Sequence, residues 1–260
     1  MHLGELGASE CFVVNSCPPS SGNVYVNGWQ SGTGRVNIAD IDGDGFLNAT
    51  YVSGKFLYAL KEDFTLLWRV VVNEETSGYT GCTVYDFNGD GAAEVVYRDE
   101  KYLYIINGND GSINTQNQCI ARTQIEYPVV ADVDADGATE ICVTCGTNDA
   151  LSLANFCDIN YSVNSQVRVF NSAGQPWVPS RKLWNQHAYF NVNVNDDLTI
   201  PKQVQNQQTF FSADPCSAGN GRALNTFLNQ TPFLNSKGCP QYVAPDLQIV
   251  NGSLNLTPPT

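Results

Sequence analysis

The residues with the clearest chemistry are the acidic and amide side chains of three short loops. Each loop begins with an aspartate, carries Asp or Asn at the third and fifth positions, and has glycine at the sixth. The first residues, Asp40, Asp86 and Asp132, lie 46 residues apart in both intervals. Oxygens at positions 1, 3 and 5, a backbone carbonyl at 7 and a further oxygen at 9 can surround a hard cation such as Ca²⁺. Glycine permits the sharp turn that such a loop needs.

The pattern therefore predicts about three calcium sites, one in each loop. The alternative is three Asp/Gly-rich hairpin turns without a metal, because Asp-Gly is a common turn signal. Turns alone, however, do not require polar oxygens at every second position. The predicted ligands, with the backbone carbonyl at each seventh position, are Asp40, Asp42, Asp44, Phe46 and Asn48; Asp86, Asn88, Asp90, Ala92 and Glu94; and Asp132, Asp134, Asp136, Ala138 and Glu140.

An EF-hand shares the first half of this pattern, but its second half is missing here. An EF-hand needs a bidentate Glu at position 12, where this chain has Tyr51, Tyr97 and Val143. It also needs flanking helices, whereas the residues around these loops alternate in the manner of β-strands. We therefore expect the acidic loops to connect strands.

The repeat extends beyond the loops and predicts a β-propeller. Residues 55–60 and 101–106 have similar sequences 46 residues apart, and a further strand-like stretch follows each. Four short strands in about 46 residues is typical of a propeller blade, with the calcium loop between the first and second strands. A stacked sandwich is the alternative, although it does not explain a strict repeat.

The domain organisation follows from where the repeat is recognisable. The third unit is interrupted by an insertion over 147–165 before its next strand, and a fourth strand-like stretch is predicted around 188–197 without a strong metal site. We expect the chain to be part of a larger protein. The predicted parts are a segment 1–34 that forms the tail of a preceding blade, blades over 35–200, a disulfide-closed extension 201–245 that docks on the propeller, and a linker 246–260.

Composition places the chain among β-rich extracellular proteins. The 260 residues, 42% of them hydrophobic, can form a sizeable core. The net charge of −13 argues against nucleic acid or an anionic membrane as a partner. No stretch approaches the ~20 apolar residues of a membrane span, so membrane insertion is not expected.

Nine cysteines without a zinc pattern favour an oxidising compartment. Two pairs close local loops and are predicted to be disulfides: Cys145 with Cys157, and Cys216 with Cys239. Cys11 with Cys17 and Cys82 with Cys119 are further candidate pairs. Cys142 and Cys145 have the spacing of a metal or redox motif, but residues three apart on a strand point to opposite faces.

Acidic loops repeated at blade spacing resemble the FG-GAP or VCBS-type repeats of integrin α-like β-propellers, whose loops bind calcium. The resemblance covers residues 35–171. Two later stretches, 180–189 and 195–201, further resemble the propeller region of large secreted surface proteins of gliding Bacteroidetes. The resemblance implies a secreted or cell-surface protein, in which calcium is structural and the ligand binds elsewhere.

No catalytic constellation is recognisable, because nearly all paired carboxylates belong to the loops. His187 is one of only two histidines and is interpreted as a packed residue, while the four tryptophans are interpreted as core residues and not as sugar-stacking platforms. We therefore expect a non-enzymatic adhesion module for an extracellular protein or glycan ligand, joined to further domains of the parent chain. The alternatives are a polysaccharide lyase or hydrolase on a calcium propeller and an architectural spacer.

Overall fold

The computed structural model describes residues 34–74, 80–121, 126–146, 165–190, 192–203 and 227–230. All regular secondary structure in these ranges is β-strand, and no helix there could cross a membrane. The strands are β1 (Asn37–Ala39), β2 (Asn48–Ser53), β3 (Phe56–Leu60), β4 (Leu66–Val71), β5 (Cys82–Tyr85), β6 (Glu94–Arg98), β7 (Tyr102–Ile106), β8 (Ile113–Gln118), β9 (Val129–Ala131), β10 (Glu140–Gly146) and β11 (Ser165–Phe170).

The strands form three antiparallel sheets, each made of strands consecutive in the chain. The first two sheets have the orders β1-β2-β3-β4 and β5-β6-β7-β8, and the third has the order β11-β10-β9. Along β2 the residues alternate between buried and half-buried, as the period of a strand requires. The prediction of an all-β chain with repeated four-stranded units is therefore confirmed for the first two repeats.

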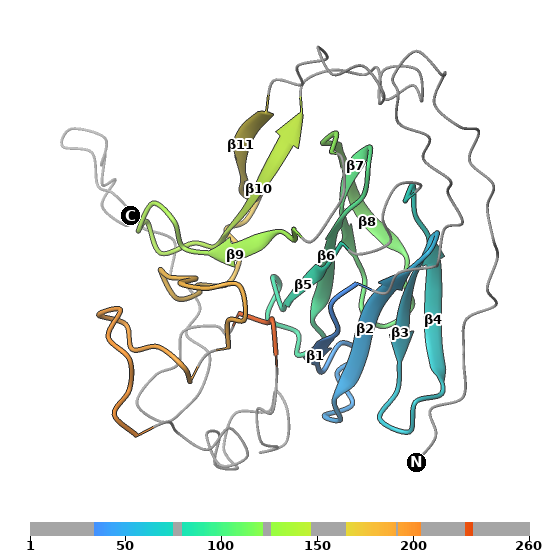
Figure 1. Cartoon of the computed structure of the whole chain (residues 1–260), viewed down its shortest axis with the longest axis horizontal. Coiled ribbons are helices and arrows are strands. Elements are labelled where there is room, and N and C mark those ends of the chain that lie inside the picture. Colours follow the sequence, from blue (N-terminus) through green and yellow to red (C-terminus); the bar gives the residue numbers. More distant parts are fainter. Residues whose placement is uncertain are drawn as a thin grey trace, which may run out of the picture.

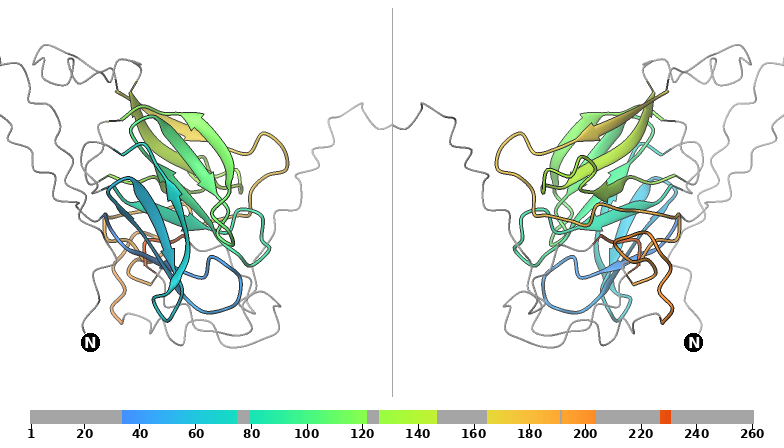
Figure 2. Two further views of the ribbon diagram at one scale, coloured as in Figure 1. Left: turned by 90° about the vertical axis from the view of Figure 1, so that its right-hand side faces the viewer. Right: turned by 90° about the vertical axis from the view of Figure 1, so that its left-hand side faces the viewer.

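The sheets follow one another as blades do. Strand β5, the first of the second sheet, contacts both β1 and β9, the first strands of the neighbouring sheets. Figure 1 shows these three short strands near the centre, with β4, β8 and β11 further out. In Figure 2 the sheets succeed one another as inclined layers. This is a propeller-like arrangement, with the first strand of each blade innermost.

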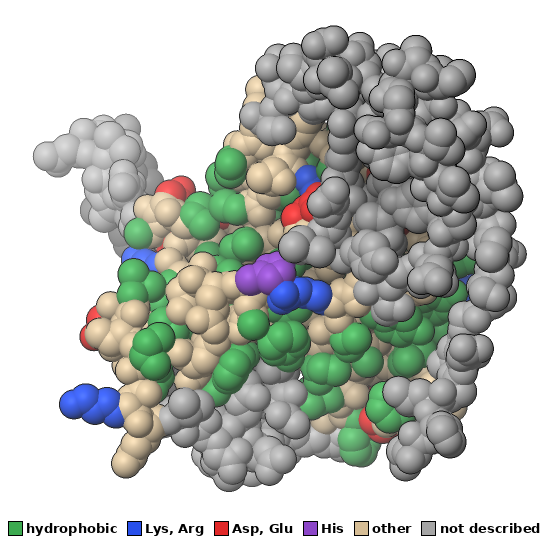
Figure 3. Space-filling view, viewed as in Figure 1, with side chains coloured by type: hydrophobic (Ala, Val, Ile, Leu, Met, Phe, Trp, Pro, Cys, Tyr) green, Lys and Arg blue, Asp and Glu red, His purple; other side chains and the backbone are tan. Residues whose placement is uncertain are grey.

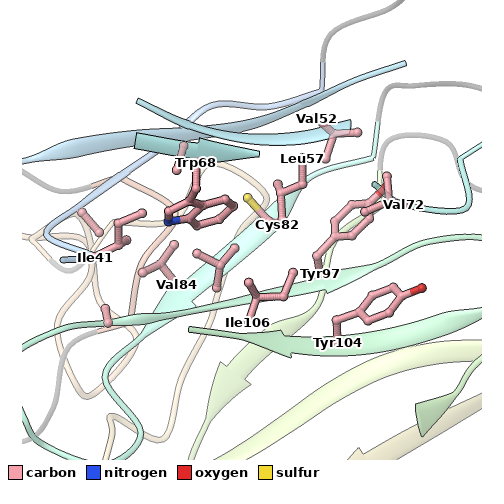
Figure 4. Close-up of a cluster of buried hydrophobic side chains, with 14 residues drawn as sticks. Ile41, Val52, Leu57, Trp68, Val72, Cys82, Val84, Tyr97, Tyr104 and Ile106 are labelled. Carbon is pink, nitrogen blue, oxygen red and sulfur yellow. The ribbon is translucent and has the colours of Figure 1, made fainter. Parts of the chain in front are cut away.

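Two hydrophobic clusters fill the spaces between the sheets. The second sheet is buried on both faces, since Val95 and Tyr97 belong to the cluster shared with the first sheet and Val96 to the cluster shared with the third. Figure 4 shows the first cluster, in which Trp68 and Leu57 of the first sheet face Val84 and Ile106 of the second. Fully burying one such aliphatic side chain contributes about 1.5–3 kcal/mol to stability, so the blades stabilise one another.

The prediction that Cys145 pairs with Cys157, and the candidate pair Cys82 with Cys119, are both wrong. Cys119, just after β8, is bonded to Cys145 of β10, with Cα atoms 4.8 Å apart. The bond therefore joins the second sheet to the third. Cys82 is a buried free thiol in the cluster between the first two sheets, where its Sγ accepts a hydrogen bond from Asn37 Nδ2 at 3.3 Å. Cys119 belongs to the cluster between the second and third sheets, so the two cysteines cannot pair. Cys11, Cys17, Cys216 and Cys239 lie outside the described residues.

The strand predicted around 188–197 is also not present. This part of the chain turns instead: the backbone N–H of Leu198 donates to the carbonyl of Asn195 at 2.9 Å, and Asp197 Oδ1 accepts from the backbone N–H of Thr199 at 3.0 Å. Asn and Asp side chains favour such local bonds, which compete with a sheet.

Residues 227–230 lie across the inner strands. Phe227 and Ile38 exchange two backbone hydrogen bonds at 3.0 and 3.1 Å, and Asn229 forms a parallel bridge with Val84. The side-chain amide of Gln230 donates to the carbonyl of Val130 at 3.0 Å. This short segment therefore contacts all three inner strands. The segment 1–34 is described at residue 34 only, and the linker 246–260 and most of the extension 201–245 also lie outside the described residues.

Candidate metal centres in the three acidic loops

The acidic loops join the inner strand of each sheet to its neighbour. They connect β1 to β2, β5 to β6 and β9 to β10, the place predicted from the sequence. All three therefore lie at the same end of the inner strands, where the chain leaves those strands.

Two residues of each loop have a left-handed backbone, which explains how the loops turn. At the sixth position Gly45, Gly91 and Gly137 have φ values of 81°, 93° and 93°. At the fourth position the φ values are also positive, at 70°, 75° and 65°. Glycine occupies this position in the first two loops, but the third has Ala135, whose Cβ disfavours the conformation. The spacing analysis had identified only the sixth position.

In the first two loops the leading aspartate is held by the backbone amides of these turns. Asp40 accepts bonds of 2.8 Å from the N–H groups of Gly43 and Gly45, one on each carboxylate oxygen. Asp86 repeats the arrangement with Gly89 at 2.6 Å and Gly91 at 2.9 Å. The turn therefore fixes the direction of the leading carboxylate before any ion is considered.

Side-chain oxygens further along each loop accept hydrogen bonds from backbone N–H groups only two residues away in the sequence. At position five, Asp44, Asp90 and Asp136 each accept from the backbone N–H two residues later, at 2.7 to 2.8 Å. In the first and third loops the aspartates at positions 1, 3 and 5 can bring one oxygen each within 4.8 Å of one another. The second loop substitutes the amide oxygen of Asn88 for one of these carboxylates.

The ninth residue fastens the base of each loop. Asn48, Glu94 and Glu140 accept a hydrogen bond from the backbone N–H of the second loop residue, at 2.9, 3.0 and 3.0 Å. The predicted ligand at this position therefore has one oxygen engaged in the protein. In Glu94 the second oxygen also accepts a bond, from Asn88 Nδ2 at 3.0 Å.

Burial makes the negative charge of these loops unfavourable without a cation. It raises the pKa of Asp40 to about 6 and the pKa of Glu94 and of Glu140 to about 7, despite the hydrogen bonds that these carboxylates accept. Neighbouring aspartates raise these pKa values further by repulsion. A bound cation would supply the missing positive charge and hold the carboxylates ionised.

Orphaned oxygens provide the test of whether the loops fit a cation. Both carboxylate oxygens of Asp132 are buried without a hydrogen-bond partner, as is Oδ1 of Asp42. The side chain of Asp132 is 1% exposed, and its cationic neighbour among the described residues is Lys182, whose Nζ lies 3.9 Å from Oδ2. Buried carboxylate oxygens without donors are costly unless an ion satisfies them. The loops therefore suit a hard, oxygen-loving cation.

Sequence reasoning missed two features of this site. Lys182 lies far from the third loop in the chain, and only the fold brings it to Asp132. The first two loops also touch: the backbone N–H of Ala93 donates to the carbonyl of Asp40 at 3.3 Å, and Gly43 lies against Ala92. The repeat predicts blades side by side, but not that their acidic loops are in contact.

The other candidate residues, the two cysteines of the possible redox motif and the described tryptophans, take part in the packing and cross-linking of the fold. Cys145 is in a disulfide, which removes it from any pair with Cys142. Trp68 is a buried core residue whose Nε1 donates to the carbonyl of Gly108 at 2.6 Å. Trp177 and Trp184 are half-buried and contact other aromatic rings, and Trp29 lies outside the described residues.

Comparison with known proteins supports the repeat and the fold. The family model described as "FG-GAP-like repeat" matches residues 86–143, which include the second and third acidic loops and end within β10. No curated protein sequence matches the chain. Among solved structures the chain is similar to the V. cholerae biofilm matrix protein Bap1, with 24% identity and a TM-score of 0.57. The similarity covers 75% of this chain but only 28% of Bap1, so the chain corresponds in fold to a part of that protein.

Proposed function

We propose that this chain is a calcium-stabilised, propeller-like adhesion module of a larger secreted or cell-surface protein. The observation that carries the calcium assignment is Asp132, a carboxylate buried to 1% exposure with both oxygens unpartnered, beside Asp134 and Asp136. The positive φ values at positions four and six, and the hydrogen bond from the second residue to the ninth, recur in the other two loops. In each loop the ion would lie among the carboxylate and amide oxygens at positions 1, 3 and 5, with the carbonyl at position 7.

The adhesion role is supported by the kind of protein that this chain resembles. FG-GAP-like repeats and the fold of a biofilm matrix protein are consistent with a module that acts outside the cell. The cross-sheet disulfide between Cys119 and Cys145 fits an oxidising compartment. We infer that the partner is an extracellular protein or glycan, and we propose that the parent protein resembles the large secreted surface proteins of gliding Bacteroidetes.

We propose further that the module is not an enzyme. His187, the histidine of the described region, contacts Tyr127 and Arg35, and it forms no hydrogen bond there with a carboxylate or a nucleophile. A general base needs such a positioned partner. A lyase or hydrolase would reveal itself by depolymerising a panel of acidic and neutral polysaccharides, whereas an adhesion module would bind one without shortening it.

Calcium binding is tested on the purified chain by counting metal and by measuring melting in calcium and in EGTA. We expect about three ions per chain, each weak, as is typical of extracellular modules. At 1 mM calcium and a Kd of ~10⁻⁴ M, one site adds about 1.4 kcal/mol, so three sites add roughly 4 kcal/mol. An identical melting temperature in EGTA together with no retained calcium would refute the assignment.

The extension 201–245 is proposed to dock on the inner strands. The backbone pairing of Phe227 with Ile38 and the bonds from Gln230 to the carbonyls of Val130 and Leu183 support this proposal. Limited proteolysis tests it. Docking predicts that cleavage begins after about residue 245 and that truncation at 200 destabilises the sheets. Ready release of an intact piece by a cut near residue 201, without loss of melting temperature, contradicts it.

A further inference from the structure

Equivalent residues of the three repeats converge at the end of the inner strands opposite the acidic loops. Arg35, Gly81 and Tyr127 lie 46 residues apart, each just ahead of an inner strand, whereas the acidic loops follow those strands. A Cβ atom at Gly81 would lie 3.2 Å from the Cβ of Tyr127 and 3.6 Å from that of Arg35. Because Gly81 has no side chain, the side chains of Arg35 and Tyr127 can approach each other.

His187 and Trp184 complete this group, which we call the axial mouth: Arg35, Gly81, Tyr127, Trp184 and His187. The ring of Tyr127 stacks on that of His187 with centroids 5.0 Å apart, and Trp184 Nε1 donates to the hydroxyl of Tyr127 at 3.3 Å. The carbonyl of His187 accepts bonds from the Tyr127 hydroxyl and from Arg35 Nη1, the latter at 2.8 Å. These contacts hold the aromatic rings and the guanidinium in fixed relation.

Among the residues that the structure describes, the positive charge of Arg35 has no carboxylate partner. Its contacts are the single bond to the carbonyl of His187 and the face of Tyr127, with 5.9 Å from Cζ to the ring centroid. The remaining N–H groups of its guanidinium form a fork that matches a carboxylate.

The mouth is open to solvent. His187 is exposed and Arg35, Tyr127 and Trp184 are half-buried. Figure 3 shows a histidine and a basic side chain next to each other on one face, with apolar side chains around them. Burial and the charge of Arg35 lower the pKa of His187, so at neutral pH the guanidinium is the cation of this group. A ligand here meets the guanidinium of Arg35, the exposed His187 and the half-buried rings of Tyr127 and Trp184.

We propose that the axial mouth binds a sugar residue that carries a carboxylate, such as a uronic acid within an otherwise neutral polysaccharide. The carboxylate pairs with Arg35, and the pyranose ring packs on the aromatic side chains beside it. A polyanion is disfavoured because the chain itself is strongly acidic, which leaves isolated acidic sugars as the matching chemistry. This inference deepens the proposed adhesion function by naming the class of ligand.

The test titrates the calcium-loaded chain with galacturonic acid and with galactose, which differ at the carboxylate, and follows binding by NMR. We expect millimolar binding of galacturonic acid and binding of galactose that is roughly 10–100-fold weaker, the loss of a charge-assisted bond. Arg35→Gln should remove the preference, and Arg35→Lys should retain part of it. Arg69→Gln is the matched control, because Arg69, on the outermost strand β4 of the first sheet, also lies over an aromatic ring, that of Phe56.

Three outcomes overturn the proposal: equal binding of the two sugars, unchanged preference in Arg35→Gln, or loss of preference in Arg69→Gln. Acetate and a short acidic peptide form the last arm, and equal or tighter binding of either at the mouth rejects a sugar as the ligand. Calcium content and melting temperature are recorded for each variant. They test the metal sites separately, since Arg35 lies at the opposite end of the inner strand from the first loop.

Discussion

Glu94 fastens the second acidic loop by accepting, through Oε2, a hydrogen bond from the backbone N–H of Phe87 at 3.0 Å. Its other oxygen accepts from Asn88 within the same loop. The ninth residue therefore stabilises the loop through hydrogen bonds within the protein, in addition to its predicted role as a ligand. Because a buried carboxylate carries a cost, the hydrogen bond and the charge of Glu94 have opposite effects on the metal-free protein.

Two substitutions separate these effects. Glu94→Gln keeps an acceptor for the Phe87 N–H but removes the charge and the acceptor for Asn88, whereas Glu94→Ala removes the charge and both acceptors. At pH 8 in EGTA we expect Glu94→Ala to be less stable than Glu94→Gln by about 1–3 kcal/mol, the cost of an unpaired buried donor. Both should show a smaller gain in melting temperature on adding calcium than the unmodified chain. Equal melting of the two variants in EGTA would show that the hydrogen bond does not contribute.

The sequence predicts most of the strands and the acidic loops, because both follow from local patterns. Alternating residues such as those of β2, and Asp and Gly at fixed positions, report on the structure around them. The bond between Cys119 and Cys145 could not be predicted, since it depends on how the second sheet meets the third. Lys182 beside Asp132 is a contact of the same long-range kind. The strand expected around 188–197 failed because local Asn and Asp bonds compete with pairing.

Ala135 is a strained residue whose replacement by glycine should stabilise the third loop. Its φ of 65° is one that the first two loops assign to Gly43 and Gly89. Left-handed geometry costs an alanine roughly 1–2 kcal/mol, part of which is offset by the greater freedom of glycine in the unfolded chain. Chemical denaturation should show a gain of about 0.5–1 kcal/mol. The reciprocal change, Gly89→Ala, should destabilise the protein. This account is contradicted if Ala135→Gly does not stabilise the protein, or if Gly89→Ala stabilises it as well.

Lys182 should weaken calcium binding at the third loop. Its ammonium group lies 3.9 Å from the buried carboxylate of Asp132. Two positive charges repel, so the ammonium group disfavours a calcium ion at the same carboxylate. Because 54% of the lysine side chain is exposed, solvent screens the effect to about 0.5–1 kcal/mol. Lys182→Met should therefore tighten one of the three sites by about two- to fivefold in calorimetry. Lys202→Met, at an exposed lysine, is the control, and a similar gain there would show an effect of net charge alone.

Loss of the Cys119–Cys145 disulfide should destabilise the contact between the second and third sheets. The bond spans 26 residues, for which chain entropy suggests roughly 3.5 kcal/mol. We expect the double variant Cys119→Ser/Cys145→Ser to unfold at lower denaturant concentration by a comparable free energy. Peptide mapping without reductant should recover the two cysteines in one linked species. Recovery of Cys145 linked to Cys157 would contradict the assigned bond.

Gly108 should be irreplaceable, because it lies where the first two loops meet. A Cβ atom there would be 2.1 Å from the carbonyl oxygen of Ile41 and 2.2 Å from that of Ala93, both of them backbone atoms next to loop ligands. Backbone cannot move aside as a flexible side chain can, so Gly108→Ala must displace both loops.

We expect Gly108→Ala to cost at least about 1–3 kcal/mol and to weaken calcium binding at the first two sites while sparing the third. Gly174→Ala is the control, since an added Cβ there meets nothing within 4 Å and should leave stability unchanged or raise it by up to about 1 kcal/mol. Calorimetric titration together with melting distinguishes the outcomes. Uniform weakening of all three sites would indicate general unfolding, and unchanged binding would show that the close approach of Gly108 to the loops is not needed for metal affinity.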